Sequence, residues 1–159
     1  MKSIIVYYSL EGNTEYAAKK IAEKTGCDLL RINPVKSYPK SGFRKFFWGG
    51  KSAVMSETPE LEPYSFNAEK YDQIIIGFPV WAGNFTPPIR SFIKNNNLQN
   101  KTVSVFACQS GSGAEKAFQK LKNELGLNGF RAEMILIDPK SKPSAENEKK
   151  IEEFCAAVE

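Results

Sequence analysis

Two kinds of apolar pattern alternate along the chain. Short runs rich in β-branched and aromatic residues are typical of buried strands, and they alternate with segments whose apolar residues recur every three or four positions, as on one helix face. The expected strands are residues 3–8, 27–32, 71–78, 101–108 and 130–137, and the expected helices are residues 13–25, a segment starting at 87, 114–125 and 144–158. This alternation predicts a five-stranded parallel sheet with right-handed crossovers, a doubly wound α/β/α sandwich in three layers.

One connection, residues 33–70, is much longer than the others. Phe43, Phe46 and Phe47 stand at helical spacing within it and predict a short helix. Its charge is uneven, because residues 33–56 carry five basic residues and no acid, whereas residues 57–72 are acidic. Such a distribution is typical of a solvated face, and it also suits an acidic partner or an anionic ligand.

Composition narrows the class of protein. A chain of 159 residues, 42% of them hydrophobic, suits one domain over residues 1–159. No apolar run approaches the roughly 20 residues of a membrane span, and the first residues are typical of a strand and not of a signal peptide. Three cysteines without metal-site spacing predict reduced thiols and a cytoplasmic location. The absence of histidine excludes His-dependent triads, and we expect no metal site.

The loop after the first expected strand has the chemistry of an anion site. In such sheets ligands bind beyond the carboxyl ends of the strands, where the strand order reverses. Backbone N–H groups and the dipole of the following helix converge there, with hydroxyl and amide side chains nearby. The loop lacks the lysine and the glycine spacing of nucleotide loops, so it suits one terminal phosphate held by neutral donors without a cation. The simpler interpretation is a well-capped strand-to-helix turn. The residues are Ser9, Leu10, Glu11, Gly12, Asn13 and Thr14.

Three segments together resemble the flavodoxin family. SLEGNT is similar to its phosphate loop, GFPVWAGNFTPPIRSF to its loop after the third strand, and ACQSGSGAEKAF to its loop after the fourth. The segments occur in the family's order and on the expected elements, and the resemblance covers essentially the whole chain. It implies a short-chain flavodoxin-like protein with bound FMN.

The resemblance also implies which residues bind the cofactor. The loop of residues 9–14 would hold the FMN phosphate, and Trp81 would stack on the flavin, with a peptide near Gly83 at its reactive edge. Without the resemblance, Trp81 would more often be a semi-buried packing residue. The segment along the flavin is Pro79, Val80, Trp81, Ala82, Gly83 and Asn84. The segment at its pyrimidine end is Gln109, Ser110, Gly111, Ser112 and Gly113.

Two departures from the family pattern matter. QSGSG lacks the aromatic residue that usually covers the outer flavin face, so that face is either open or covered by Phe46, Phe47 or Trp48. The favoured interpretation of this segment is an amphipathic helix whose Phe residues pack on the sheet. The net charge is +4, whereas flavodoxins are usually strongly acidic. The difference predicts partners with acidic surfaces or a less negative hydroquinone potential.

Two functions remain open at this stage, and neither needs a catalytic acid or base. The favoured one is an electron-transfer protein that carries single electrons between a reductase and an acceptor protein. The alternative is an NAD(P)H-dependent FMN-containing quinone or flavin reductase, which would use an open flavin face. Nucleic-acid binding is disfavoured, since only FRKFFWGGK supports it. Cys108, at the end of a strand, is expected to be a buried inert thiol.

Overall fold

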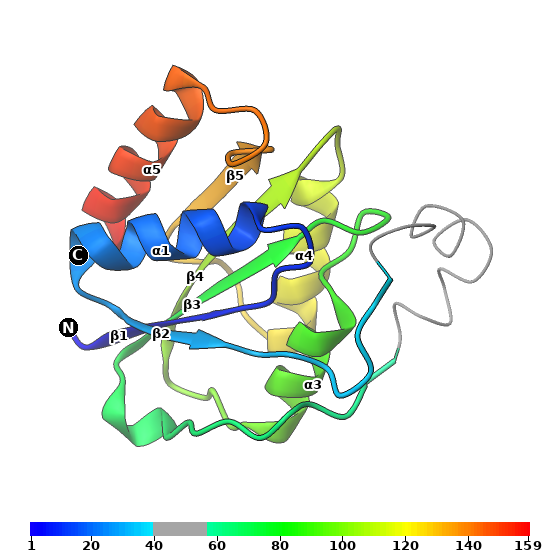
Figure 1. Ribbon diagram of the computed structural model, residues 1–159. Helices are drawn as coiled ribbons and strands as arrows, with labels where there is room; N and C mark the ends of the chain where they lie inside the picture. The colour runs from blue at the N-terminus through cyan, green and yellow to red at the C-terminus, as the bar shows by residue number, and fades with distance from the viewer. Residues whose placement is uncertain (40–56) are drawn as a thin grey trace.

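A five-stranded parallel sheet forms the centre of the computed structural model, which describes residues 1–39 and 57–159. Its strand order is β2-β1-β3-β4-β5, so the order reverses between β1 and β3. Helices α1 and α5 cover one face and α3 and α4 the other (Figure 1). The strands are β1 (Ser3–Tyr7), β2 (Asp28–Arg31), β3 (Gln73–Pro79), β4 (Thr102–Gln109) and β5 (Glu133–Ile137). The helices are α1 (Asn13–Thr25), the 3₁₀ turn η1 (Ala68–Lys70), α3 (Pro87–Asn95), α4 (Ala114–Leu125) and α5 (Ala145–Val158). The predicted doubly wound sandwich is confirmed.

The helices end where the sequence signals predict. Gly26 and Gly126 stop α1 and α4 in the left-handed conformation, with φ of 72° and 66°. Ser144 caps α5, because its hydroxyl oxygen accepts the N–H of Asn147 at 3.1 Å. Pro87 occupies the first turn of α3, where its missing N–H costs nothing.

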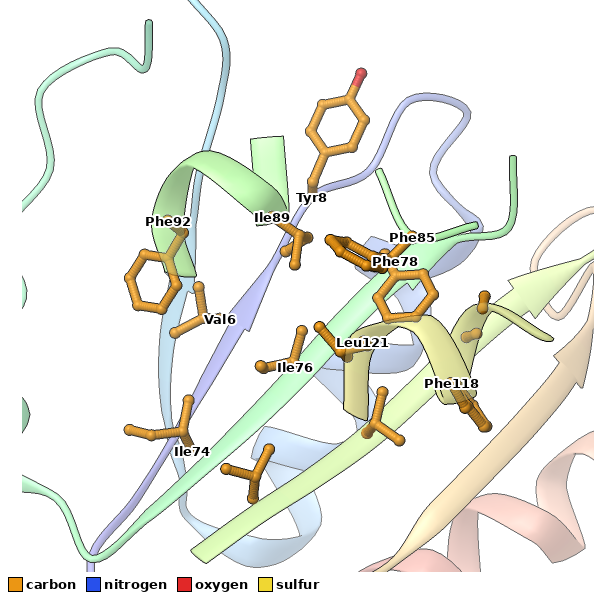
Figure 2. Packing of buried hydrophobic residues seen from close by; sticks show 14 of the residues in the cluster. Val6, Tyr8, Ile74, Ile76, Phe78, Phe85, Ile89, Phe92, Phe118 and Leu121 are labelled. Carbon is orange, nitrogen blue, oxygen red and sulfur yellow. The ribbon is translucent and has the colours of Figure 1, made fainter. Parts of the chain in front are cut away.

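The layer between the sheet and α3 and α4 is aromatic-rich (Figure 2). Phe78 of β3 meets Phe85 and Phe118 edge-on, with ring centroids 6.2 Å and 6.1 Å away. Tyr8 lies at the margin of this cluster, and its hydroxyl points away from the other labelled side chains. The aromatic packing therefore reaches the edge of the sheet from which the functional loops depart.

On the opposite face, the ring of Phe106 on β4 occupies the space above Gly77 of β3. A Cβ built on Gly77 would lie only 2.2 Å from the Phe106 Cζ atom. The two residues are paired in the β3–β4 register. Glycine at position 77 is thus required by packing, since its backbone angle is ordinary.

The two edge strands differ from the sequence prediction. β2 covers only Asp28–Arg31 and is mostly exposed, with Leu29 43% exposed, because only β1 pairs with it. β5 begins at Glu133 and not at residue 130. Phe130 instead packs edge-on against Phe118, with centroids 6.3 Å apart. Phe130 is apolar because it packs against α4, and this apolar residue made the predicted strand longer than the segment that pairs with β4.

Candidate cofactor site

Four of the connections that leave the carboxyl edge of the sheet surround the candidate site. We name them by the strand that each follows: loop 1 is residues 8–12, loop 3 is residues 80–86, loop 4 is residues 110–113 and loop 5 is residues 138–144. Loops 1, 3 and 4 contain most of the predicted site residues. None of the predicted site residues lies in loop 5, although β5 ends at the same edge.

Loop 1 leaves backbone donors free at the start of α1. Gly12 is the N-cap with φ 98°, and its carbonyl accepts the N–H of Tyr16. The N–H of Glu15 donates to Ser9 Oγ at 3.2 Å. Within residues 1–39 and 57–159, the N–H groups of Asn13 and Thr14 find no acceptor. Two adjacent free donors at a helix N-terminus suit an anion.

Thr14 adds a buried hydroxyl to these donors. Its side chain is part of a residue only 1% exposed, and Oγ1 has no hydrogen-bond partner of normal geometry in the described part of the chain. It lies near the Cys108 thiol and lowers the thiol's pKa, but the contact does not have the geometry of a hydrogen bond. A buried hydroxyl without a partner costs free energy unless a ligand supplies one. This orphaned group fits a phosphate at the loop.

The Asn13 side chain holds a neighbouring loop, and its oxygen is not turned to a ligand. Asn13 Oδ1 accepts the backbone N–H groups of Lys140 and Ser141 at 2.9 Å and 3.1 Å. This joins loop 5 to loop 1. It also places the Lys140 side chain over loop 1, because a Cβ built on Gly12 would lie 3.0 Å from Lys140 Nζ. A cation therefore lies beside the loop, and the expectation that neutral donors alone hold a phosphate there stays a prediction.

Loop 3 forms a tight turn at Ala82 and Gly83. Trp81 and Asn84 exchange N–H···O bonds of 3.0 Å on either side of it. Both central residues have positive φ, 50° and 69°, as in a type I′ turn. The peptide between Ala82 and Gly83 takes no part in this pair of bonds, and the use of a peptide near Gly83 at the flavin stays a prediction.

Trp81 sits in an aromatic group at the base of loop 3. It is 5% exposed, and its ring meets those of Tyr8 and Tyr38 edge-on, with centroids 5.6 Å and 5.1 Å away. Burial raises the pKa of Tyr38 to about 12, with the Glu57 charge as a second cause. This phenol is therefore neutral at physiological pH. Trp81 packs as an interior residue here, and stacking on a flavin remains a prediction.

Loop 4 is exposed along its middle and anchored at both ends. Ser110 donates its hydroxyl to Asp138 Oδ1 at 2.8 Å, and Gln109 Oε1 accepts the N–H of Ala114 at 3.0 Å. A Cβ on Gly113 would lie 3.0 Å from the Gly83 Cα atom, so loops 3 and 4 meet through their glycines. Loop 5 thus holds loop 4 as well as loop 1.

The Cys108 thiol is inert, as the sequence predicted. It lies at the end of β4, and burial raises its pKa to about 12. A thiol with so high a pKa is neither a nucleophile nor a metal ligand at neutral pH. Among residues 1–39 and 57–159, no cluster of three or more Cys, Asp or Glu side chains could hold a metal ion. No helix of these residues is long and apolar enough to cross a membrane.

Sequence reasoning missed Tyr38, Asp138 and Lys140. The position of loop 5 could have indicated the last two, because all carboxyl ends of a parallel sheet share one edge. No signal indicated Tyr38, which meets Trp81 only through the fold. Phe46, Phe47 and Trp48, the candidates for covering the flavin, lie outside the described residues, as does most of the basic segment and the helix predicted there.

Comparison with known proteins identifies the family. The sequence model described as flavodoxin matches residues 2–152. A crystal structure from Bacteroides eggerthii, assigned as a flavoprotein, is 26% identical with a TM-score of 0.78, and the match covers 99% of this chain and 97% of that one. One from Bacteroides uniformis, assigned likewise, is 29% identical with a TM-score of 0.75, over 86% and 90%. A Lactobacillus acidophilus flavoprotein in complex with FMN shares the fold at 21% identity and a TM-score of 0.70, over 88% and 95%. This chain therefore belongs to the flavodoxin family.

Proposed function

We propose that this protein binds FMN at loops 1, 3 and 4 and carries single electrons between protein partners. The observation that carries the proposal is the start of α1. There the free N–H groups of Asn13 and Thr14 and the orphaned Thr14 hydroxyl leave donors for one phosphate. The FMN complex of the Lactobacillus acidophilus protein, which has the same fold, supports the choice of ligand.

Each loop has a distinct part in this proposal. Loop 1 binds the phosphate through Asn13 and Thr14. Loop 3 orients the ring system with the peptides of Ala82 and Gly83 and with the Trp81 side chain. Loop 4 lies at its polar end. FMN, when bound, supplies the redox chemistry, and the protein supplies binding, orientation and the exclusion of water.

The carrier function rests on the exposure of loop 4. An electron carrier needs its cofactor near the protein surface, where partner proteins can approach it, and residues 110–112 of loop 4 are exposed.

One observation favours the reductase alternative. Lys116 Cδ would lie 3.2 Å from a Cβ on Gly83, so its side chain borders loop 3. Lys120, one helical turn on, has a lowered pKa, chiefly from burial and then from the Lys116 and Arg90 charges. Neither lysine forms an ion pair with a described residue. Unneutralised charge there could bind the phosphates of a nicotinamide cofactor.

Reduction kinetics separate the two functions. The purified protein is loaded with FMN and mixed anaerobically with NADH or NADPH, with and without a separate flavodoxin reductase, while the flavin absorbance is followed. We expect prompt reduction only when the reductase is present. Prompt reduction by the nicotinamide alone, lost in Lys116→Gln and Lys120→Gln, would establish the reductase instead. No uptake of FMN would refute both.

A further inference from the structure

We infer that Lys140 of loop 5 binds the phosphate of the cofactor, and that it makes the site selective for phosphorylated flavin. The inference rests on the proposed FMN site and adds a charged group to it. It assigns a role to a loop that the resemblance to the family did not include.

The position of the Lys140 side chain is the first support. The backbone of loop 5 is fixed to loop 1, because Asn13 Oδ1 accepts the N–H groups of Lys140 and Ser141. From this anchor the side chain crosses Gly12, with Nζ 3.0 Å and Cδ 3.3 Å from the place of a Gly12 Cβ. The ammonium thus lies beside the residue that precedes the two free N–H groups of α1.

Electrostatics provide the second support. The N-terminus of α1 carries the positive end of the helix dipole, so a cation beside it is unfavourable unless an anion lies near both. Lys140 forms no ion pair with any described residue, whereas Lys142 of the same loop approaches Asp138 at 3.9 Å. Glu15, in the first turn of α1, is already paired with Lys19 and Arg31. The missing counter-charge is the one that a phosphate would bring.

The orphaned Thr14 hydroxyl is the third support, and it is independent of charge. Thr14 Oγ1 is buried and has no hydrogen-bond partner in the described part of the chain. A phosphate that accepted hydrogen bonds from Thr14 and from the N–H groups of α1 would lie next to Gly12. Lys140 Nζ would then add a charge-assisted hydrogen bond from the solvent side.

Paired titrations test the inference. The dissociation constants of FMN and riboflavin, which differ only by the phosphate, are measured by flavin fluorescence for the wild type, Lys140→Gln, Lys140→Arg and Lys149→Gln. Lys149 is the matched control, since it carries the same charge, is 77% exposed and pairs with Glu153 on α5. The backbone N–H of Lys140 remains in every variant, so the bond to Asn13 is retained.

We expect Lys140→Gln to weaken FMN binding roughly tenfold, the effect of one partly exposed charge-assisted hydrogen bond, and to leave riboflavin binding unchanged. Lys140→Arg should restore most of the FMN affinity, and Lys149→Gln should resemble the wild type. Added salt should weaken FMN binding more in the wild type than in Lys140→Gln.

Three results would overturn the inference. If the wild type binds FMN and Lys140→Gln binds it equally well, the inference fails while the proposed function stands. If Lys140→Gln weakens FMN and riboflavin alike, the residue acts on the structure of the loops and not on the phosphate. A wild type that binds neither flavin would refute the proposed function itself, and with it the role of Lys140.

Discussion

Ala82 adopts a left-handed backbone conformation, with φ 50°, at the tip of loop 3. This region is unfavourable for residues with a Cβ, because the Cβ approaches the carbonyl oxygen. Ala82 is exposed, so no buried contact of its methyl group offsets this cost. Backbone strain of this kind often marks functional sites, and here it lies beside the peptide predicted to face the flavin.

Replacing Ala82 with glycine should therefore stabilise the protein. We expect Ala82→Gly to raise the free energy of unfolding by about 0.5–1 kcal/mol, since relief of strain exceeds the added entropy of glycine in the unfolded chain. Urea denaturation measures the change. The matched control is Ala156→Gly on an exposed position of α5, which should lower stability by up to about 1 kcal/mol. A loss of stability in Ala82→Gly would show that the turn is not strained.

At the scale of elements, α1 and α5 are linked across their surface by paired side chains. Glu148 of α5 accepts hydrogen bonds from Tyr16 and Lys20 of α1, both at 2.8 Å. Lys24 and Glu152 form a second link one turn further on. These bonds hold together the two helices that cover the same face of the sheet.

The link through Glu148 should depend on pH. The Lys20 hydrogen bond, and then that of Tyr16, lower the pKa of Glu148 below its usual range. A lowered carboxyl pKa stabilises the fold above the unfolded pKa, about 4.3, and this stability is lost as pH falls through the folded value. We expect Glu148→Gln to lower the free energy of unfolding by about 0.5–1 kcal/mol at pH 7, given its exposure, and by progressively less as the pH falls below the unfolded pKa.

Urea denaturation of the wild type and of Glu148→Gln between pH 3 and 7 measures this difference. Glu153→Gln is the control, because the one ion pair of Glu153 with a described residue lies within α5, with Lys149 at 3.7 Å. Glu153→Gln should lower the free energy of unfolding by less than about 0.5 kcal/mol at pH 7. A difference for Glu148→Gln that does not change with pH would show that packing, and not charge, links the helices.

The elements themselves were largely predictable, and the exceptions have physical reasons. Periodicity reflects burial, and it identified α1, α4 and the central strands because these are buried on the side that the pattern indicates. It could not show that β2 is an edge strand, since pairing partners far away in sequence decide that. For the same reason it extended β5 to Phe130, which is partly buried against α4 without joining the ladder.

At the scale of the whole molecule, separate parts of the chain converge on one site. The sequence predicted loops 1, 3 and 4 because their glycine and hydroxyl residues resemble a known pattern. It could not predict the contact of Lys140 with loop 1, because the Asn13 bond that creates it spans 127 residues. Likewise, the meeting of Tyr38 with Trp81 depends on how the long connection folds back.

A ligand held by several loops should stabilise the whole fold. At a free FMN concentration of 100 times its dissociation constant, we expect the free energy of unfolding to rise by about 2.7 kcal/mol. This corresponds to a rise in melting temperature of about 5–10 °C for a chain of this size. Thermal denaturation followed by circular dichroism measures it. Adenosine monophosphate, with a phosphate but no flavin ring, should give a smaller rise, and an equal rise would argue against recognition of the ring.

The close approach of Phe106 to Gly77 has a consequence for how this protein can evolve. The 2.2 Å gap leaves no room for a methyl group at position 77 while a phenyl ring stands at position 106. A larger residue at position 77 or a smaller one at position 106, introduced alone, should lower stability. The two positions should therefore change together, with a larger residue at 77 only after a smaller residue at 106. Because Gly77 lies on β3 just before loop 3, the history of the proposed cofactor site is tied to a pair of residues outside its loops.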